Sequence, residues 1–359
     1  MRITFLTPSD NLTGGNRVVA TYAAELQRRG HAVLVVSNAP DRPDWREKLR
    51  RSRRGDLDWM KPPVPVPGHV ALSGVPHRVL ERPRMIVAAD LPDADVVIAT
   101  WWETALWMHA LPAAKGRKVH LIQGYEVWLG ADTVPRVHDA LRLPNRKVAI
   151  SSSLKAQIEA ALGPLGIEVV PNAVDLSVFD APARPRGQPP VAGFIHSAMA
   201  IKGSDVCIAA IQQARRTLPA LKVLCFGTEA PGAELPLPPD AEFHLRPSAT
   251  LLPTLYARCD AWLFGSRLDS FGLPILEAMA CRVPVIGVPI GAAPELLPDG
   301  GGTLVPGEDP AAMARALVAL LGGAEATWRE RADAAHARAH RYSWIDATDR
   351  LLALIANAP

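Results

Sequence analysis

The sequence predicts an α/β protein of two doubly wound domains, with parallel sheets whose ligand-binding edges face a cleft. The chain has 359 residues, a length at which one hydrophobic core usually gives way to two. Short apolar runs alternate with segments of helical period. A linker at 180–190, rich in Pro, Ala and Arg, divides this alternation into two halves.

The first half opens with a buried strand expected at 2–8. A glycine-containing loop follows, and residues 17–30 then place apolar side chains at helical spacing and end at Gly30. Because a second strand is expected at 32–37, this stretch forms a βαβ unit with parallel strands. Further strands are expected at 94–100, 118–124, 147–151 and 167–174, with a helix at 151–162.

The alternation restarts after the linker. Strands are expected at 191–196, 222–227, 261–266, 284–288 and 303–306, and helices at 204–217, 250–259 and 274–281. We therefore predict two α/β domains joined by this linker.

Composition excludes several classes of protein. With 48% hydrophobic and 21% charged residues, the chain is too apolar for a disordered protein. No uncharged apolar run is long enough to cross a membrane, and the apolar stretch before Asp10 is too short for a secretory signal. The four cysteines lack metal-ligand spacing and are expected to be buried thiols. We expect a cytoplasmic protein.

Charge is unevenly divided between the halves. Residues 1–172 carry 23 Lys and Arg against 17 Asp and Glu, a net +6, whereas residues 173–359 carry 16 against 19, a net −3. The overall balance of +3 comes with no nucleic-acid-binding motif, so we expect no nucleic-acid partner.

The loop after the first strand is a candidate anion site. Gly14, Gly15 and Asn16 precede the first helix, and glycines there let backbone amides approach an anion at the helix N-terminus. The alternative is an ordinary glycine turn.

Two carboxylates mark a second candidate site. Asp269 lies in a loop and Glu277 in the first turns of a helix begun by Pro274, with the amides of Ser270, Phe271, Gly272 and Leu273 between them. Carboxylates accept hydrogen bonds from sugar hydroxyls, and amides donate to phosphate oxygens. The alternative is a capping acid followed by a solvated acid.

Residues 267–297 resemble the signature of family 4 retaining glycosyltransferases of the GT-B fold, which usually reads E-S-F-G-L-P-x-L-E-A-M-A-C-G-x-P-V-I. Here the segment reads D-S-F-G-L-P-I-L-E-A-M-A-C-R-V-P-V-I from Asp269. Other similar segments cover nearly the whole chain: 13–33, 169–179, 201–211, 254–266, 301–317 and 342–354. The resemblance implies two Rossmann-like domains, with the C-terminal domain of 173–335 on the donor side and residues 336–359 packing back on the acceptor-side domain of 1–172.

The resemblance also implies roles for single residues. Glu277 would bind the ribose hydroxyls of the nucleotide and Asp269 the hydroxyls of the transferred sugar. Lys202 would neutralise the donor diphosphate, which the amides of Gly15 and of 271–273 would also contact. The stretch around Arg246 would contact the base, largely through its backbone.

Several positions depart from the family pattern. Asp269 replaces the usual glutamate, and Ser197 stands where an arginine commonly contacts the diphosphate. Arg267 or Arg282 could replace that arginine, although solvated side chains are the alternative. Gln123 stands where many members carry a histidine, and Gln123 and Glu126, which follow a strand, are candidate catalytic, sugar or acceptor ligands.

Two further segments are candidates for the acceptor. Trp101, Trp102 and Glu103 follow a strand, and paired aromatics either stack on sugars or lipids or form core. The basic run at 46–54 is either a solvated face or a contact for an anionic membrane surface.

We therefore expect a retaining, metal-independent glycosyltransferase without a cofactor or metal site. It would transfer a sugar from a nucleoside diphosphate donor, UDP in preference to GDP, to a glycan, lipid-linked or small-molecule acceptor. One alternative is a nucleotide-sugar epimerase of the same fold. Another is a sugar-nucleotide-binding protein with weakened catalysis.

Overall fold

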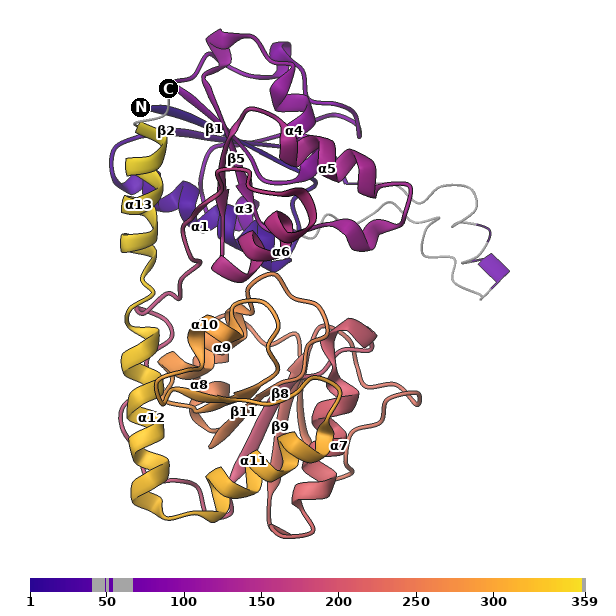
Figure 1. Cartoon of the computed structure of the whole chain (residues 1–359), viewed down its shortest axis with the longest axis vertical. Coiled ribbons are helices and arrows are strands. Elements are labelled where there is room, and N and C mark those ends of the chain that lie inside the picture. The colour runs from indigo at the N-terminus through magenta and orange to yellow at the C-terminus, as the bar shows by residue number, and fades with distance from the viewer. Residues whose placement is uncertain (41–48, 50–51, 54–66, 357–359) are drawn as a thin grey trace. The chain divides into compact units, whose positions relative to one another are not determined.

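The computed structural model describes residues 1–40, 49, 52–53 and 67–356 of the chain. The described residues fall into two compact units (Figure 1). The first unit draws on Met1–Val148, Leu162–Glu168 and Thr348–Pro359, and the second on Ala149–Ala161 and Val169–Ala347. The longest continuous part of the second unit therefore runs from Val169 to Ala347. The domain bounds 1–172, 173–335 and 336–359 stay a prediction.

The first unit is built on a seven-stranded sheet with the order β3-β2-β1-β4-β5-β6-β7. The pairs from β3 to β5 are parallel. The strands are β1 Arg2–Thr7, β2 Ala32–Ser37, β3 His77–Val79, β4 Val96–Ala99, β5 Arg117–Ile122, β6 Arg146–Ala149 and β7 Glu168–Val169. The principal helices between them are α1 Gly14–Arg28, α3 His69–Leu72, α4 Trp102–His109, α5 Val134–Arg142 and α6 Ser152–Leu162.

The second unit holds a six-stranded sheet with the order β10-β9-β8-β11-β12-β13, and every neighbouring pair is parallel. The strands are β8 Val191–Ile195, β9 Lys222–Gly227, β10 Glu242–Leu245, β11 Ala261–Phe264, β12 Val285–Gly287 and β13 Gly302–Leu304. The helices are α7 Ser204–Ala214, α8 Leu252–Ala257, α9 Leu273–Ala280, α10 Ala293–Leu296, α11 Pro310–Gly322 and α12 Glu325–Ala339. Helix α7 packs with α11, and α9 packs with α8 and α12.

Aromatic side chains fill the core of the second unit. Trp262 on β11 lies 4.6 Å from Tyr256 and 5.5 Å from Phe226, measured between ring centroids. Gly193 on the neighbouring strand β8 makes room for them, because a Cβ there would meet the Trp262 ring at 2.6 Å. The four cysteines are free and buried, which confirms the prediction of buried thiols.

The chain ends in helix α13, Trp344–Ala356, whose part from Thr348 onward belongs to the first unit. Asp349 pairs with Arg29 of the first unit at 3.0 Å, and the Ala356 carbonyl accepts from Arg117 Nη1 at 2.9 Å. Leu351 and Ile355 are completely buried. The end of the chain therefore completes the packing of the unit with which the chain begins.

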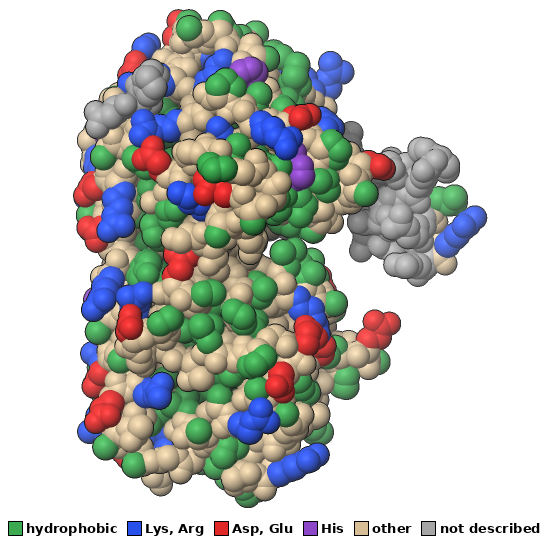
Figure 2. All heavy atoms as spheres, viewed as in Figure 1, with side chains coloured by type: hydrophobic (Ala, Val, Ile, Leu, Met, Phe, Trp, Pro, Cys, Tyr) green, Lys and Arg blue, Asp and Glu red, His purple; other side chains and the backbone are tan. Residues whose placement is uncertain are grey.

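Charged side chains of both signs are interspersed over each unit on the face drawn in Figure 2. The excess of +6 in the first half of the sequence is therefore not gathered into one basic patch on that visible face. None of the helices formed by the described residues combines the length and the apolar character that crossing a bilayer requires.

Candidate functional site

The strand orders place a ligand-binding edge in each unit. In the first sheet the connections reverse direction between β1 and β4, and in the second between β8 and β11. In open parallel sheets, ligands bind beyond the carboxyl ends of the strands at such a reversal. In the second unit the loops after β8 and β11 carry Lys202 and Asp269, the two predicted contacts of a sugar diphosphate.

The loop that carries Lys202 is fixed against the loop after β11 by close backbone packing. Gly203 has a left-handed backbone with φ of 63°, and a Cβ there would lie 1.8 Å from the Gly265 carbonyl oxygen. The Arg267 amide donates to the Ile201 carbonyl at 2.8 Å. Only glycine suits position 203, both for its conformation and for its space.

Lys202 and Asp269 form an ion pair, with Nζ 3.0 Å from Oδ2. The lysine side chain is 38% exposed and the aspartate 19%, so the pair remains open to solvent. The other carboxylate oxygen of Asp269 accepts from the Phe271 amide at 3.2 Å. The predicted diphosphate cation and the predicted sugar carboxylate are thus held together on rigid backbone.

Glu277 is buried on α9, with 4% of its surface exposed. Tyr256, completely buried on α8, donates its hydroxyl to Glu277 Oε2 at 2.8 Å. The helix begins after Gly272, whose φ of 88° lets the chain turn sharply, and Pro274 occupies its first turn. Pro274 has no backbone N–H and the Ile275 amide donates to the Gly272 carbonyl at 2.9 Å, so Leu273 offers the amide at the start of α9 that is suited to donate to an anion.

Arg246 follows β10 with a left-handed backbone, φ of 47°. Its amide donates to the Gly227 carbonyl at 2.8 Å and its Nε to the Thr228 carbonyl at 2.7 Å. Both bonds tie the residue to the carboxyl end of β9. The guanidinium is therefore used to hold this loop in place, so a contact with the base would be made by the backbone, as predicted from the resemblance.

In the first unit the structure brings Gly15 and Gln123 together. A Cβ on Gly15 would meet the Gln123 side chain at 3.6 Å, and the buried Gln123 Oε1 has no hydrogen-bond partner among the described residues. Asn16 instead serves the loop itself, because its Oδ1 accepts from Thr7 and its Nδ2 donates to the Ser9 carbonyl at 3.0 Å.

Glu126 is 3% exposed, at the start of a short 3₁₀ turn, Val127–Leu129. Burial raises the pKa of its carboxyl to about 8, although a hydrogen bond from its own backbone opposes the rise. At neutral pH this carboxyl is mostly protonated, so it can donate one hydrogen bond and accept others.

In the predicted aromatic acceptor segment Trp102 is buried, whereas Trp101 and Glu103 are half-buried. Trp102 is 4% exposed, and the Arg136 guanidinium lies 4.7 Å from its ring centroid. Of the two interpretations of the tryptophan pair, Trp102 therefore follows the core interpretation. The basic run at 46–54 lies outside the described residues, apart from Leu49, Ser52 and Arg53.

Two family models match the chain along most of its length. The model described as "Glycosyltransferase Family 4" matches residues 12–178, and the model described as "Glycosyl transferases group 1" matches residues 189–322. The chain belongs to the family 4 and group 1 glycosyltransferases. The resemblance based on the 267–297 signature is confirmed.

Curated relatives of this glycosyltransferase include a D-inositol 3-phosphate glycosyltransferase of Segniliparus rotundus, 30% identical over 63% of this chain and 57% of the relative. One from Mycobacterium marinum, with the same printed name, is 30% identical over 53% of this chain and 45% of the relative. The chain thus spans about half the length of the curated relatives it matches.

Solved structures share the whole fold of the glycosyltransferase. Anabaena Alr3699/HepE in complex with UDP-glucose has a TM-score of 0.76 at 17% identity, with all of both chains covered. Sucrose-phosphate synthase from Thermosynechococcus elongatus has a TM-score of 0.75 at 18% identity, covering 99% of this chain and 98% of that one. The predicted fold class, two doubly wound α/β domains of GT-B type, is confirmed.

Neither candidate for the missing diphosphate arginine is available in this glycosyltransferase. Arg267 pairs with Asp205 at 2.7 Å and with Glu308 at 2.6 Å, and these carboxylates raise its pKa. Arg282 pairs with Asp333 and donates from Nε to the Ala181 carbonyl at 2.9 Å. The hypothesis that either residue replaces the arginine is not supported, because both guanidinium groups already bind carboxylates.

Sequence reasoning missed the residues that hold the site together. Tyr256 lies in a predicted helix and in the similar segment 254–266, but no residue role was expected of it, and only the fold brings it to Glu277. Asp205 and Glu308, the partners of Arg267, are 103 residues apart in the chain. No local pattern in the sequence indicates such pairs.

Proposed function

We propose that the chain transfers a sugar from a UDP-linked donor to an acceptor, with retention of the anomeric configuration. The observation that carries the proposal is the Lys202–Asp269 pair at the reversal point of the second sheet, beside the α9 N-terminus. Such a cation and helix N-terminus suit a diphosphate, and the carboxylate suits sugar hydroxyls. The structures of Alr3699/HepE in complex with UDP-glucose and with UDP support UDP as the nucleotide.

In this proposal Asp269 keeps Lys202 in position before the donor arrives. When the donor binds, the diphosphate replaces Asp269 as the ion-pair partner of the lysine ammonium, because it is the stronger anion. Asp269 then accepts hydrogen bonds from the hydroxyls of the sugar. Glu277, oriented by Tyr256, accepts from the ribose hydroxyls. The Leu273 amide at the start of α9 stabilises charge on the leaving diphosphate, where fixed donors lower the barrier most.

The proposed reaction breaks the bond between the anomeric carbon and the phosphate oxygen and forms a bond from that carbon to the acceptor oxygen. Attack on the same face explains retention, and the proton of the acceptor hydroxyl passes to the departing phosphate oxygen. These two bond changes and one proton transfer account for every atom and require neither a metal ion nor a redox cofactor.

In the first unit Gln123 and the protonated Glu126 are the proposed ligands of the acceptor or of the transferred sugar. The relatives from Segniliparus rotundus and Mycobacterium marinum are named D-inositol 3-phosphate glycosyltransferases, which favours a small polyol or its phosphate as the first acceptor to test. A glycan or a lipid-linked acceptor is the alternative class. The cytoplasmic location predicted from the sequence stays a prediction.

The test is an NMR assay of products formed from UDP-glucose and UDP-N-acetylglucosamine with a panel of polyol phosphates and glycans. We expect an α-linked product from an α-linked donor. Lys202→Ala should reduce kcat/KM by about 100-fold, because it removes the cation at the diphosphate. Lys222→Ala, at an exposed lysine at the start of β9, is the matched control. A β-linked product would contradict retention, and equal rates of the two variants would contradict the role of Lys202.

Because Ser197 replaces the usual arginine and both Arg267 and Arg282 are paired with carboxylates, one other candidate function is favoured, a protein that binds the sugar nucleotide but turns it over weakly. Slow hydrolysis of the donor without acceptor separates the two. Donor binding without any turnover across the panel would favour the binding protein. Conversion of the donor into an epimer would identify an epimerase.

A further inference from the structure

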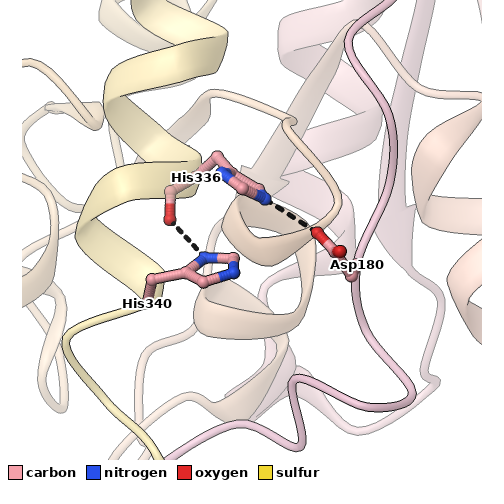
Figure 3. Close-up of side chains that lie close together, drawn as sticks. All are labelled: Asp180, His336 and His340. Carbon is pink, nitrogen blue, oxygen red and sulfur yellow. Dashed lines mark hydrogen bonds and ion pairs between the residues drawn. The ribbon is translucent and has the colours of Figure 1, made fainter.

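Three potential metal ligands meet in the second unit, apart from the sheet edge that carries Lys202 and Asp269. Figure 3 shows Asp180, from the segment before β8, facing His336 and His340 at the C-terminal end of α12. One ligand atom from each residue lies within 4.8 Å of the other two. The sequence analysis expected no metal site, although the two histidines are four residues apart on a helix.

The hydrogen bonds around the cluster prepare the histidines to bind a metal ion. His340 Nδ1 lies 2.9 Å from the His336 carbonyl oxygen, and because a carbonyl only accepts, this nitrogen carries the proton. The other ring nitrogen, Nε2, is therefore the one with the lone pair. Metal-bound histidines are commonly oriented by such a bond from their second nitrogen to a backbone carbonyl.

The remaining two ligand atoms already point at each other. His336 Nε2 lies 2.7 Å from Asp180 Oδ1. A bound ion would replace the proton between them, and the three side chains would adjust until each ligand atom lies about 2 Å from the ion, the ordinary zinc distance. The Asp180 side chain is 57% exposed and can make this adjustment.

The neighbouring cation does not occupy the site. Arg282, which bonds to the carbonyl of Ala181 next to Asp180, pairs through its Nη1 with Asp333. Its charge is thereby offset by a carboxylate of its own. Asp180 thus remains paired with His336 and accessible to an ion from solvent.

We propose that Asp180, His336 and His340 bind a divalent ion of the zinc class, with water as the fourth ligand. Two imidazoles and one carboxylate suit Zn²⁺ better than Mg²⁺ or Ca²⁺, which prefer oxygen ligands. The ion is structural and distinct from the site of glycosyl transfer. It fastens the segment before β8 to the C-terminal end of α12.

A backbone contact already joins these two stretches of chain. The Val174 amide donates to the Tyr342 carbonyl at 3.0 Å, and Val174 forms a parallel bridge with Ser343. The ion adds a second link between the same two stretches, a few residues from Val174 in one and from Tyr342 in the other. Binding should therefore stabilise the folded second unit by linkage, because the unfolded chain lacks the assembled ligands.

The test uses the full chain, without an affinity tag and stripped of metal, titrated with ZnCl₂ in a calorimeter and followed by thermal unfolding. We expect one Zn²⁺ per chain and a higher melting temperature. Asp180→Asn, His336→Gln and His340→Gln should each weaken binding at least tenfold, since even second-shell changes cost that much. His244→Gln, which removes another surface histidine paired with a carboxylate, is the matched control and should bind as the wild type does.

Titration with CoCl₂ identifies the ligand type. A visible spectrum of nitrogen and oxygen ligation, lost in His336→Gln and kept in His244→Gln, supports the site. A thiolate charge-transfer band would assign the metal to a cysteine and overturn the proposal. Failure to bind one equivalent, or binding that all three substitutions leave unchanged, would overturn it equally. Melting temperatures in EDTA show whether each variant folds.

Discussion

The carboxyl of Glu126 couples the stability of the first unit to pH. Burial raises its pKa from 4.5 to about 8, so the folded chain binds a proton that the unfolded chain releases. The contribution of this proton to stability is complete below pH 4.5 and is lost as the pH rises through 8. Stability should therefore fall by about 1.4 kcal/mol per pH unit over that interval.

Glu126→Gln replaces the carboxyl with a neutral group of similar shape and should abolish this slope. We expect the free energy of unfolding of the variant, relative to the wild type, to rise between pH 5 and pH 8. Urea unfolding across that range measures it. Glu330→Gln, at an exposed residue of α12, is the control and should leave the slope unchanged. Parallel curves for Glu126→Gln and the wild type would refute the buried, protonated carboxyl.

At the scale of residues, the sequence predicted the chemistry of the site but few of its partners. Asp269, Glu277 and Lys202 stand out because a motif of fixed spacing contains them. Tyr256 lies in the similar segment 254–266, but its hydrogen bond to Glu277 was not predictable, because it joins two helices whose approach depends on the packed aromatic core. The same is true of the proposed zinc site. The sequence contains the four-residue spacing of His336 and His340, but only the fold brings Asp180 to them.

At the scale of elements, the turn at Gly203 decides where Lys202 lies. Gly203→Ala would force a Cβ against the Gly265 carbonyl in a left-handed backbone. We expect a loss of at least about 2 kcal/mol in the free energy of unfolding, from strain and displaced backbone together. Affinity for UDP should also fall, because the lysine loop must move.

Gly300→Ala is the matched control for this substitution. Its φ of 92° is also positive, but a Cβ there would meet only Ala334 Cβ at 3.5 Å, an ordinary contact. The variant should show the conformational strain alone, about 1 kcal/mol, with unchanged affinity for UDP. Equal losses of stability and of affinity in the two variants would contradict the close packing at Gly203. Urea unfolding and calorimetry provide both quantities.

Most strands were predictable because they are apolar runs bounded by turns. The strands expected at 2–8, 32–37, 94–100, 118–124 and 147–151 all contain observed strands. Two strands were missed, β3 and β10, whose residues are half-buried or exposed and so carry no continuous apolar signal. They lie at the edges of their sheets, where a strand has a neighbouring strand on one side alone and is therefore less buried.

At the scale of the whole molecule, α13 makes the stability of the first unit depend on the end of the chain. Leu351 is completely buried, so Leu351→Ala would leave a cavity and should lower the free energy of unfolding by about 2–5 kcal/mol. Ile345→Ala, on the same helix but 54% exposed, should cost well under 1 kcal/mol. Denaturant unfolding distinguishes the variants, and similar small losses for both would contradict the packing of α13 on the first unit.

The duplicated architecture follows from alternation along the chain, but the assignment of residues to units does not. Residues 336–347, which include the first turn of α13, are grouped with the second unit. Residues 149–161 are grouped with the second unit as well. Such assignments depend on contacts between distant segments, for example Val174 with Tyr342. Whole-domain charge was also uninformative, since the more acidic half carries the lysine of the proposed donor site.

The most direct test of the proposed function is calorimetric titration of the chain with UDP. We expect one UDP per wild-type chain. Glu277→Ala should bind at least about tenfold more weakly, because a carboxylate contact with the ribose contributes about 1.5–3 kcal/mol. Glu330→Ala should bind as the wild type does. Glu277→Ala that folds normally and binds UDP as tightly as the wild type would contradict the nucleotide site on α9.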